Sequence, residues 1–158
     1  MVAAARPRTI VIDPVKADHS PTWPPIDDGL WLVTPGRVNQ NFTTTRPGRW
    51  RLWLKGDIAR PLTATIDGRR IGSAGWQAGG EGNYLAPLEL NLAAGRHRLD
   101  LVRGGGGLQP GSGAFSRLLR VVLEPADSGR DGGVLERVPA SRAAALCGRS
   151  LDWIELAR

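Results

Sequence analysis

The residue types that most often carry acid–base or nucleophilic chemistry are scarce in this sequence. Its two histidines are His19 and His97, and its one cysteine is Cys147. His97 falls on the apolar side of a predicted strand, where a hydrogen-bonded core histidine is expected rather than a catalytic base. Ser112 lies between two glycines, without the G-x-S-x-G elbow and following helix that a nucleophilic serine uses. Because no nucleophile is paired with a base, we predict that the chain is not an enzyme and has no catalytic residues.

Aromatic residues point to binding chemistry instead. The chain contains six tryptophans, and a flat indole or phenol ring stacks well on the C–H face of a pyranose. The glycine-rich segment 75–84 combines aromatic rings with planar amides and a carboxylate, groups that pair well with sugar hydroxyls. We therefore predict a ligand-binding site on this loop, formed by Trp76, Gln77, Glu81, Asn83 and Tyr84.

Trp53 marks an alternative position for this site, on the face of a sheet. In the predicted strand Arg49–Lys55, Trp53 points to the polar side, away from the core. If the neighbouring strand carries Thr63 and Thr65, their hydroxyls would contribute to a site there. Tyr84 has two interpretations, because it begins a predicted strand on the apolar side and would either contact ligand or close the core.

The remaining candidate residues are expected to be structural. Cys147 is predicted to be a small buried side chain, and a single cysteine excludes an internal disulfide. A structural calcium ion stays open because Asp57, Asp67 and Glu81 lie near turns, although no D-x-D-x-D run accompanies them. We expect no other cofactor and assign no metal ligands. The tryptophans expected to anchor the core or an arm are Trp23, Trp31, Trp50 and Trp153.

Length and composition favour one globular domain with many turns. The 158 residues include 21 glycines and 12 prolines, more than a helical bundle tolerates. The net charge is +6, but the basic residues are scattered, so we expect no nucleic-acid partner. No run approaches the roughly 18 apolar residues of a membrane helix, and we expect no membrane span in this chain.

Alternation of apolar and polar residues with a period of two predicts an all-β fold, an antiparallel β-sandwich. The Asp67-Gly68 pair predicts a tight hairpin. The predicted strands are Leu30–Thr34, Val38–Thr45, Arg49–Lys55, Leu62–Ile66, Tyr84–Leu92, Arg96–Arg103 and Leu118–Glu124. The predicted core includes Trp50, Leu52, Leu54, Leu99, Leu101, Val121 and Leu123.

The pattern divides the chain into three parts. Residues 1–27 are predicted to form a short strand and an irregular arm packed on the domain, and residues 28–125 the sandwich. Residues 126–158 are predicted to form a loop, a short helix and a final strand that pack back on the sandwich. Ser141 caps the predicted helix, which runs to Cys147.

Three segments together carry a family resemblance: GRWRLWLKG, LTATIDGRRIG and LELNLAAGRHRLDLVRG. Their order resembles jelly-roll carbohydrate-binding modules attached to glycan-active enzymes. With the LQPGSG loop and the LCGRSLDWIE tail, the chain is similar to the soluble C-terminal domain of bacterial multi-spanning envelope glycosyltransferases.

That resemblance implies a non-catalytic module that binds glycan or cell-envelope polysaccharide. It also implies an extracytoplasmic location in the cell envelope, as part of a larger membrane-anchored parent protein whose remainder is a partner. One alternative is a purely structural or protein-interaction sandwich, in which the same aromatic residues pack on other domains. A further alternative is an independent hydrolase.

Overall fold

The structure of the chain is a computed structural model. It describes residues 2–5, 9–75, 84–105, 116–126, 134–137, 139, 141–142, 144, 147 and 151–155, with the backbone alone at 2–5, 134–137 and 151–155. The strands are β1 (Val2–Ala5), β2 (Ile10–Ile12), β3 (Asp18–His19), β4 (Pro25–Ile26), β5 (Gly29–Trp31), β6 (Gly36–Thr44), β7 (Gly48–Asp57), β8 (Leu62–Ile66), β9 (Arg69–Ala74), β10 (Leu88–Leu92), β11 (Gly95–Arg103), β12 (Arg117–Pro125), β13 (Val134–Arg137) and β14 (Leu151–Glu155).

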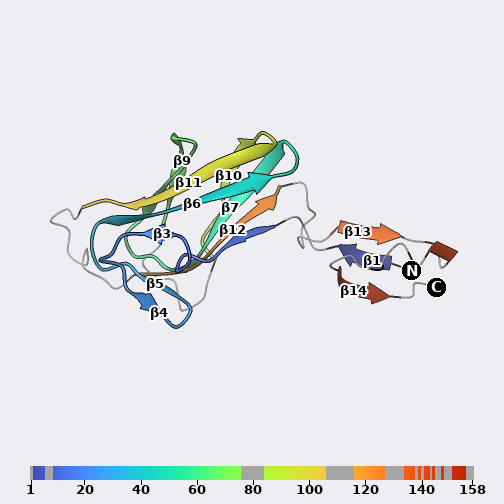
Figure 1. The fold of residues 1–158 in the computed structure, drawn as a ribbon, viewed down its shortest axis with the longest axis horizontal. Helices are drawn as coiled ribbons and strands as arrows, with labels where there is room; N and C mark the ends of the chain where they lie inside the picture. Colours follow the sequence, from blue (N-terminus) through green and yellow to red (C-terminus); the bar gives the residue numbers. More distant parts are fainter. Residues whose placement is uncertain are drawn as a thin grey trace.

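Two antiparallel sheets face each other and build the main body (Figure 1). One has the strand order β10-β7-β12-β5-β4, with β2 also paired to β12, and the other has the order β3-β6-β11-β8-β9. The predicted all-β antiparallel sandwich is confirmed. Two short strands, β3 and β4, lie in the stretch predicted to be an irregular arm, and β9 was missing from the predicted strands.

The core lies between the two sheets and follows the alternation in the sequence. In β7 the side chains of Trp50, Leu52 and Leu54 are buried, while the residues between them are half-buried on the opposite face. In β11 the side chains of Leu99 and Leu101 are fully buried. Every predicted core residue is buried, because period-two alternation alone decides which side of a strand faces inward.

The predicted Asp67-Gly68 turn joins two strands of one sheet, whereas the short segment 93–95 joins strands of different sheets. Asp67 and Gly68 have φ angles of 53° and 77°, and they join the paired strands β8 and β9. This is the positive-φ geometry that a two-residue hairpin needs, so the predicted hairpin is confirmed. The segment 93–95 instead connects β10 to β11, which belong to different sheets.

A third sheet, of three strands, has the order β13-β1-β14 (Figure 1). The final strand β14 pairs with β1 and not with a strand of the sandwich. The division of the chain into three parts, with a tail packed on the sandwich, stays a prediction.

The short C-terminal helix is not supported. In the described residues the Arg142 N–H donates to the Pro139 carbonyl and the Cys147 N–H to the Ala144 carbonyl, which are i to i−3 bonds of the 3₁₀ type.

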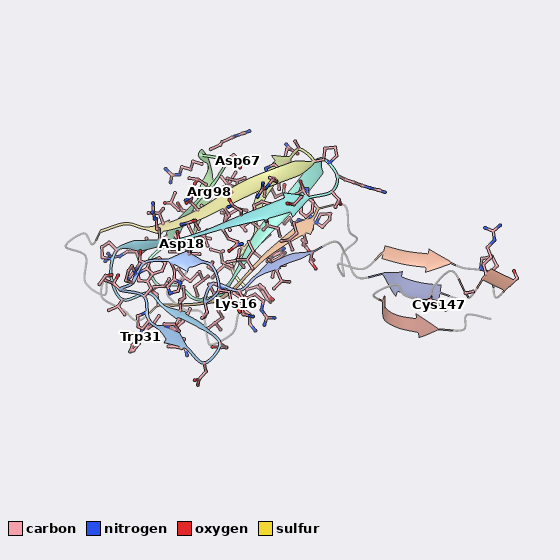
Figure 2. The ribbon with its side chains drawn as sticks, in the orientation of Figure 1. Lys16, Asp18, Trp31, Asp67, Arg98 and Cys147 are labelled. Atoms are coloured by element: carbon pink, nitrogen blue, oxygen red, sulfur yellow. The ribbon has the colours of Figure 1, made fainter. Side chains whose placement is uncertain are left out.

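The prediction that Cys147 is buried is wrong. Its side chain is exposed, on the same side of the structure as the three-stranded sheet (Figure 2). A thiol is small and weakly polar, so its presence in a sequence does not specify burial. Within the described residues, no helix has the length and apolar character to cross a membrane.

Candidate functional site

The candidate site is the solvent-facing side of the sheet that contains β7. We call it the outer face and define it by Arg49, Arg51, Trp53 and Lys55 of β7, Glu89 and Asn91 of β10, and Arg120, Val122 and Glu124 of β12. These side chains point away from the core because they alternate with buried residues along each strand. Strand β7 lies between β10 and β12, so its outward residues form the centre of the face.

Trp53 is held in a defined orientation on this face. Its indole N–H donates to Glu124 Oε1 at 2.9 Å. Trp53 itself lies opposite Val122 in the register of β7 and β12. The side chain is half-buried. Because its one polar group is already satisfied, the ring is left to make apolar or stacking contacts.

Tyr84 forms a second aromatic wall next to Trp53. The two ring centroids are 6.2 Å apart and the ring planes meet at 85°, an edge-to-face arrangement. Tyr84 is 48% exposed and pairs with Lys55 through an isolated β-bridge. It therefore does not close the core. The predicted strand Tyr84–Leu92 is shorter in the structure, because β10 begins at Leu88.

Charged residues border the aromatic pair on one side. Arg51 lies opposite Glu89 on β10 and Glu124 on β12, with N–O distances of 3.6 and 3.7 Å. Arg49 donates to Glu89 at 2.8 Å. The hydrogen bond from Arg49 and its charge, with a lesser contribution from Arg51, hold the pKa of the Glu89 carboxyl below its ordinary value, although desolvation opposes them. The lowered pKa favours the ionised form of Glu89, whose oxygens can accept hydrogen bonds from sugar hydroxyls.

The predicted site residues divide into two groups. Trp76, Gln77, Glu81 and Asn83 lie outside the described residues, so the loop site stays a prediction. Trp53 and Tyr84, which were expected to mark two alternative positions, lie next to each other.

One sequence expectation about the surroundings of Trp53 is wrong. Thr63 and Thr65 belong to β8, in the sheet opposite β7, so their hydroxyls do not complete a site around Trp53. Trp31, which was expected to anchor the core or an arm, is 36% exposed at the end of β5 and so is not part of the core, but its backbone N–H donates to the Pro24 carbonyl of the arm (Figure 2). Trp23 and Trp50 are buried as expected, at 0% and 5% exposure. The Trp153 side chain lies outside the described part.

His97 is a satisfied core histidine, as predicted. Its Nδ1 lies 2.7 Å from Asp67 Oδ2, and its Nε2 lies 3.0 Å from the Ala93 carbonyl oxygen. Burial lowers the pKa of His97, but the hydrogen bonds to Asp67 and Ala93 and the charge of Asp67 outweigh it, so the pKa is raised overall. The same contact, with the Arg98 backbone N–H, lowers the pKa of Asp67. With both ring nitrogens occupied, His97 is poorly placed to act as a base.

A structural calcium ion stays an expectation from the sequence. No group of three or more histidine, cysteine, aspartate or glutamate side chains gathers in this part of the chain. Three acidic residues were considered as calcium ligands. Of these, Asp67 contacts His97 Nδ1 and accepts from the Arg98 backbone N–H, and Asp57 lies opposite Arg117 in the register of β7 and β12. Glu81 lies outside the described residues.

The sequence reasoning missed the contribution of β10 and β12 to the outer face. Glu89, Arg120 and Glu124 each fall on the polar side of a predicted strand, so the alternation alone indicates that they face away from the core. The alternation could not show that both strands flank β7, because pairing between distant strands leaves no local signature.

Comparison with known structures finds a similar fold in several carbohydrate-binding modules. The CBM36-1 domain of a multidomain xylanase from the hindgut metagenome of Trinervitermes trinervoides matches with a TM-score of 0.54 and 14% identity, over 75% of this chain and 98% of that domain. The C-terminal CBM6 of LamC, a marine laminarinase from Zobellia galactanivorans, matches with a TM-score of 0.55 and 14% identity, over 74% and 99% of the two chains.

A third match is a CBM36 module in complex with calcium and xylotriose, with a TM-score of 0.52 and 14% identity over 72% of this chain and 97% of that one. At this level of identity the likeness shows the fold, a jelly roll like that of carbohydrate-binding modules. No protein-family model and no curated protein matches the sequence.

Proposed function

Starting from this fold, we propose that the chain is a non-catalytic module that binds glycan on its outer face, with Trp53 as the stacking platform. The observation that carries the proposal is the edge-to-face pair of Trp53 and Tyr84, which we call the aromatic corner. Trp53 is fixed by Glu124, and Tyr84 stands at 85° to it with about half of its surface exposed. A pyranose ring that stacks on one of these rings would be flanked by the other.

The polar residues around the corner suit sugar hydroxyls. Glu89 and Glu124 present carboxylate oxygens, Arg51 presents a planar guanidinium between them, and Asn91 presents an amide. Carboxylates and guanidinium groups can each engage two neighbouring hydroxyls at once. Ion pairs already join Arg51 to Glu89 and Glu124, which lowers the entropy that these three side chains lose when a ligand binds.

Two observations support a non-catalytic role. The matched structures named above include modules that are domains of larger enzymes, a xylanase and a laminarinase. In this chain His97 Nδ1 lies against Asp67, and its Nε2 lies against the Ala93 carbonyl oxygen and, at 3.2 Å, the Thr44 hydroxyl. Both His97 and Thr44 are buried, so this hydroxyl is not presented to a substrate.

A glycan array followed by calorimetry on any hit tests the proposal. Trp53→Ala should weaken binding by about 30-fold or more, the usual effect of truncating an aromatic anchor at the centre of a binding site. Trp76→Ala is the matched comparison, because it removes the platform of the predicted loop site. If Trp76→Ala abolishes binding and Trp53→Ala does not, the site is on the loop. Unchanged melting curves would show that both variants are folded.

We also propose, on the resemblance noted in the sequence, that the chain is an extracytoplasmic domain of a bacterial membrane glycosyltransferase or another envelope protein. A glycan site on such a domain would hold polymer near the attached enzyme. Surface labelling of intact cells that express the parent protein tests this, because a cytoplasmic domain would be protected from an impermeant reagent.

A purely structural or protein-interaction role is the second candidate. The observation that favours it is the exposure of two apolar side chains at one end of the sandwich, Trp31 at 36% and Val33 at 55%. Adjacent exposed apolar residues can contact another domain. Absence of any hit on the array, together with binding of the chain to another domain of its parent, would favour this role over glycan binding.

A further inference from the structure

Two basic residues lie directly opposite each other on the outer face. Lys55 of β7 and Arg120 of β12 are register partners, and residues in this relation have Cβ atoms about 5 Å apart. Arg120 is exposed and Lys55 is half-buried. Like charges placed directly opposite each other destabilise a sheet, so the pair lowers the stability of the free protein unless an anion lies between the two side chains.

The surrounding residues do not neutralise the pair. Arg51, two positions earlier on β7, has a glutamate on each side. Lys55 instead has Tyr84 as its other neighbour, with its Nζ 5.9 Å from the centre of the tyrosine ring. Among the residues that the structure describes, neither Lys55 nor Arg120 forms an ion pair with a carboxylate.

The pair is adjacent to the proposed stacking platform. Trp53 lies opposite Val122, and Val122 in turn lies opposite Val11, so these side chains form an apolar row between the glutamates and the basic pair. Lys55 follows Trp53 by two residues, about 7 Å along the strand. A sugar ring stacked on Trp53 would therefore place a substituent within reach of both basic side chains.

We infer that the outer face selects acidic glycans, with Lys55 and Arg120 binding an anionic substituent of the sugar that stacks on Trp53. The substituent is a carboxylate, as in a uronic acid, or a sulfate or phosphate ester. Arginine binds such groups through two parallel hydrogen bonds, and lysine adds a point charge. The inference rests on the proposed function. The net charge of +6 also favours association with a polyanion.

Matched pairs of acidic and neutral polysaccharides test this inference. Polygalacturonate is compared with its carboxyl-reduced form, and dextran sulfate with dextran, by affinity electrophoresis and calorimetry. The variant Lys55→Gln/Arg120→Gln removes the basic pair. The control Arg46→Gln/Arg96→Gln removes the same charge from two exposed arginines outside the outer face.

We expect at least one acidic polysaccharide to bind about 10-fold or more tightly than its neutral counterpart. The Lys55/Arg120 variant should lose that preference, and the control should stay within about threefold of the unmodified chain. Preference for polygalacturonate identifies a carboxylate, and preference for dextran sulfate identifies an ester.

Several results would overturn the inference. Equal weakening by the two double variants would show that only overall charge matters. Equal binding of acidic and neutral polysaccharides, still dependent on Trp53, would refute the inference and leave the proposed function standing. Failure of every polysaccharide and every glycan on the array to bind would refute the proposed function, and the inference with it.

Discussion

The contact between Asp67 and His97 gives a prediction about stability that can be worked through from the structure. Asp67 lies in the hairpin between β8 and β9, and Figure 2 labels it and Arg98. Its carboxylate accepts from the Arg98 backbone N–H at 2.8 Å and lies 2.7 Å from His97 Nδ1. The change Asp67→Asn keeps the size of the side chain, an acceptor for Arg98 and tolerance of positive φ. It removes the negative charge that faces His97.

The pH window follows from the direction of the two shifts. The folded pKa of His97 is raised, so its stabilisation is complete below the unfolded histidine pKa, about 6.5, and is lost as the pH rises through the folded pKa. The folded pKa of Asp67 is lowered, so its stabilisation is complete above the unfolded aspartate pKa, about 3.9, and is lost as the pH falls through the folded pKa. The contact between Asp67 and His97 therefore stabilises the folded state most between about pH 4 and 6.5.

The size of the effect is limited by solvent. The Asp67 side chain is 50% exposed while that of His97 is 8% exposed, so screening keeps the charge interaction to about 1 kcal/mol. For a chain of this length, that corresponds to a change in Tm of about 2–4 °C. Asp67→Asn should lower the free energy of unfolding by this amount near pH 5.5 and by clearly less at an alkaline pH above the folded pKa of His97.

Urea unfolding followed by tryptophan fluorescence at these two pH values measures the difference. Asp100→Asn is the control, because the partner of Asp100 is Arg98, at 3.3 Å, and arginine does not titrate in this range. Its effect should be the same at both pH values. If the Asp67→Asn effect is also independent of pH, the charge of His97 does not stabilise the fold and the reasoning fails.

Three further predictions concern the fold. Leu101→Ala should lower the free energy of unfolding by about 2–5 kcal/mol in denaturant titrations, because Leu101 is fully buried; a loss below about 1 kcal/mol would contradict its place in the core. Gly56→Ala should lower Tm more than Gly48→Ala, because a Cβ at Gly56 would lie 2.0 Å from the Arg117 carbonyl oxygen and a Cβ at Gly48 would contact nothing within 4 Å. The φ angles of the two glycines are similar, 153° and 158°, so they do not account for the difference, and equal Tm values would refute this prediction. Deleting residues 139–158 removes β14, which pairs with β1, and should lower Tm in a thermal scan; an unchanged curve would show that this strand stabilises nothing.

The sequence by itself determined which side of each long strand faces inward. Alternation in β7 placed Trp50, Leu52 and Leu54 in the core and Trp53 on the outer face, because successive side chains of a strand point to opposite sides. The Asp67-Gly68 pair specified its hairpin for an equally local reason, since both residues tolerate positive φ. These features depend only on a few neighbouring residues.

Only the tertiary structure decided which strands are neighbours. Alternation in β8 is as regular as that in β12, yet β12 pairs with β7 and β8 lies in the opposite sheet, so Glu124 and not Thr63 contacts the Trp53 platform. The Lys55–Arg120 pair likewise joins residues far apart in the sequence. Strand pairing is set by how the whole core closes, and a period-two pattern records the buried side of a strand without recording its partner.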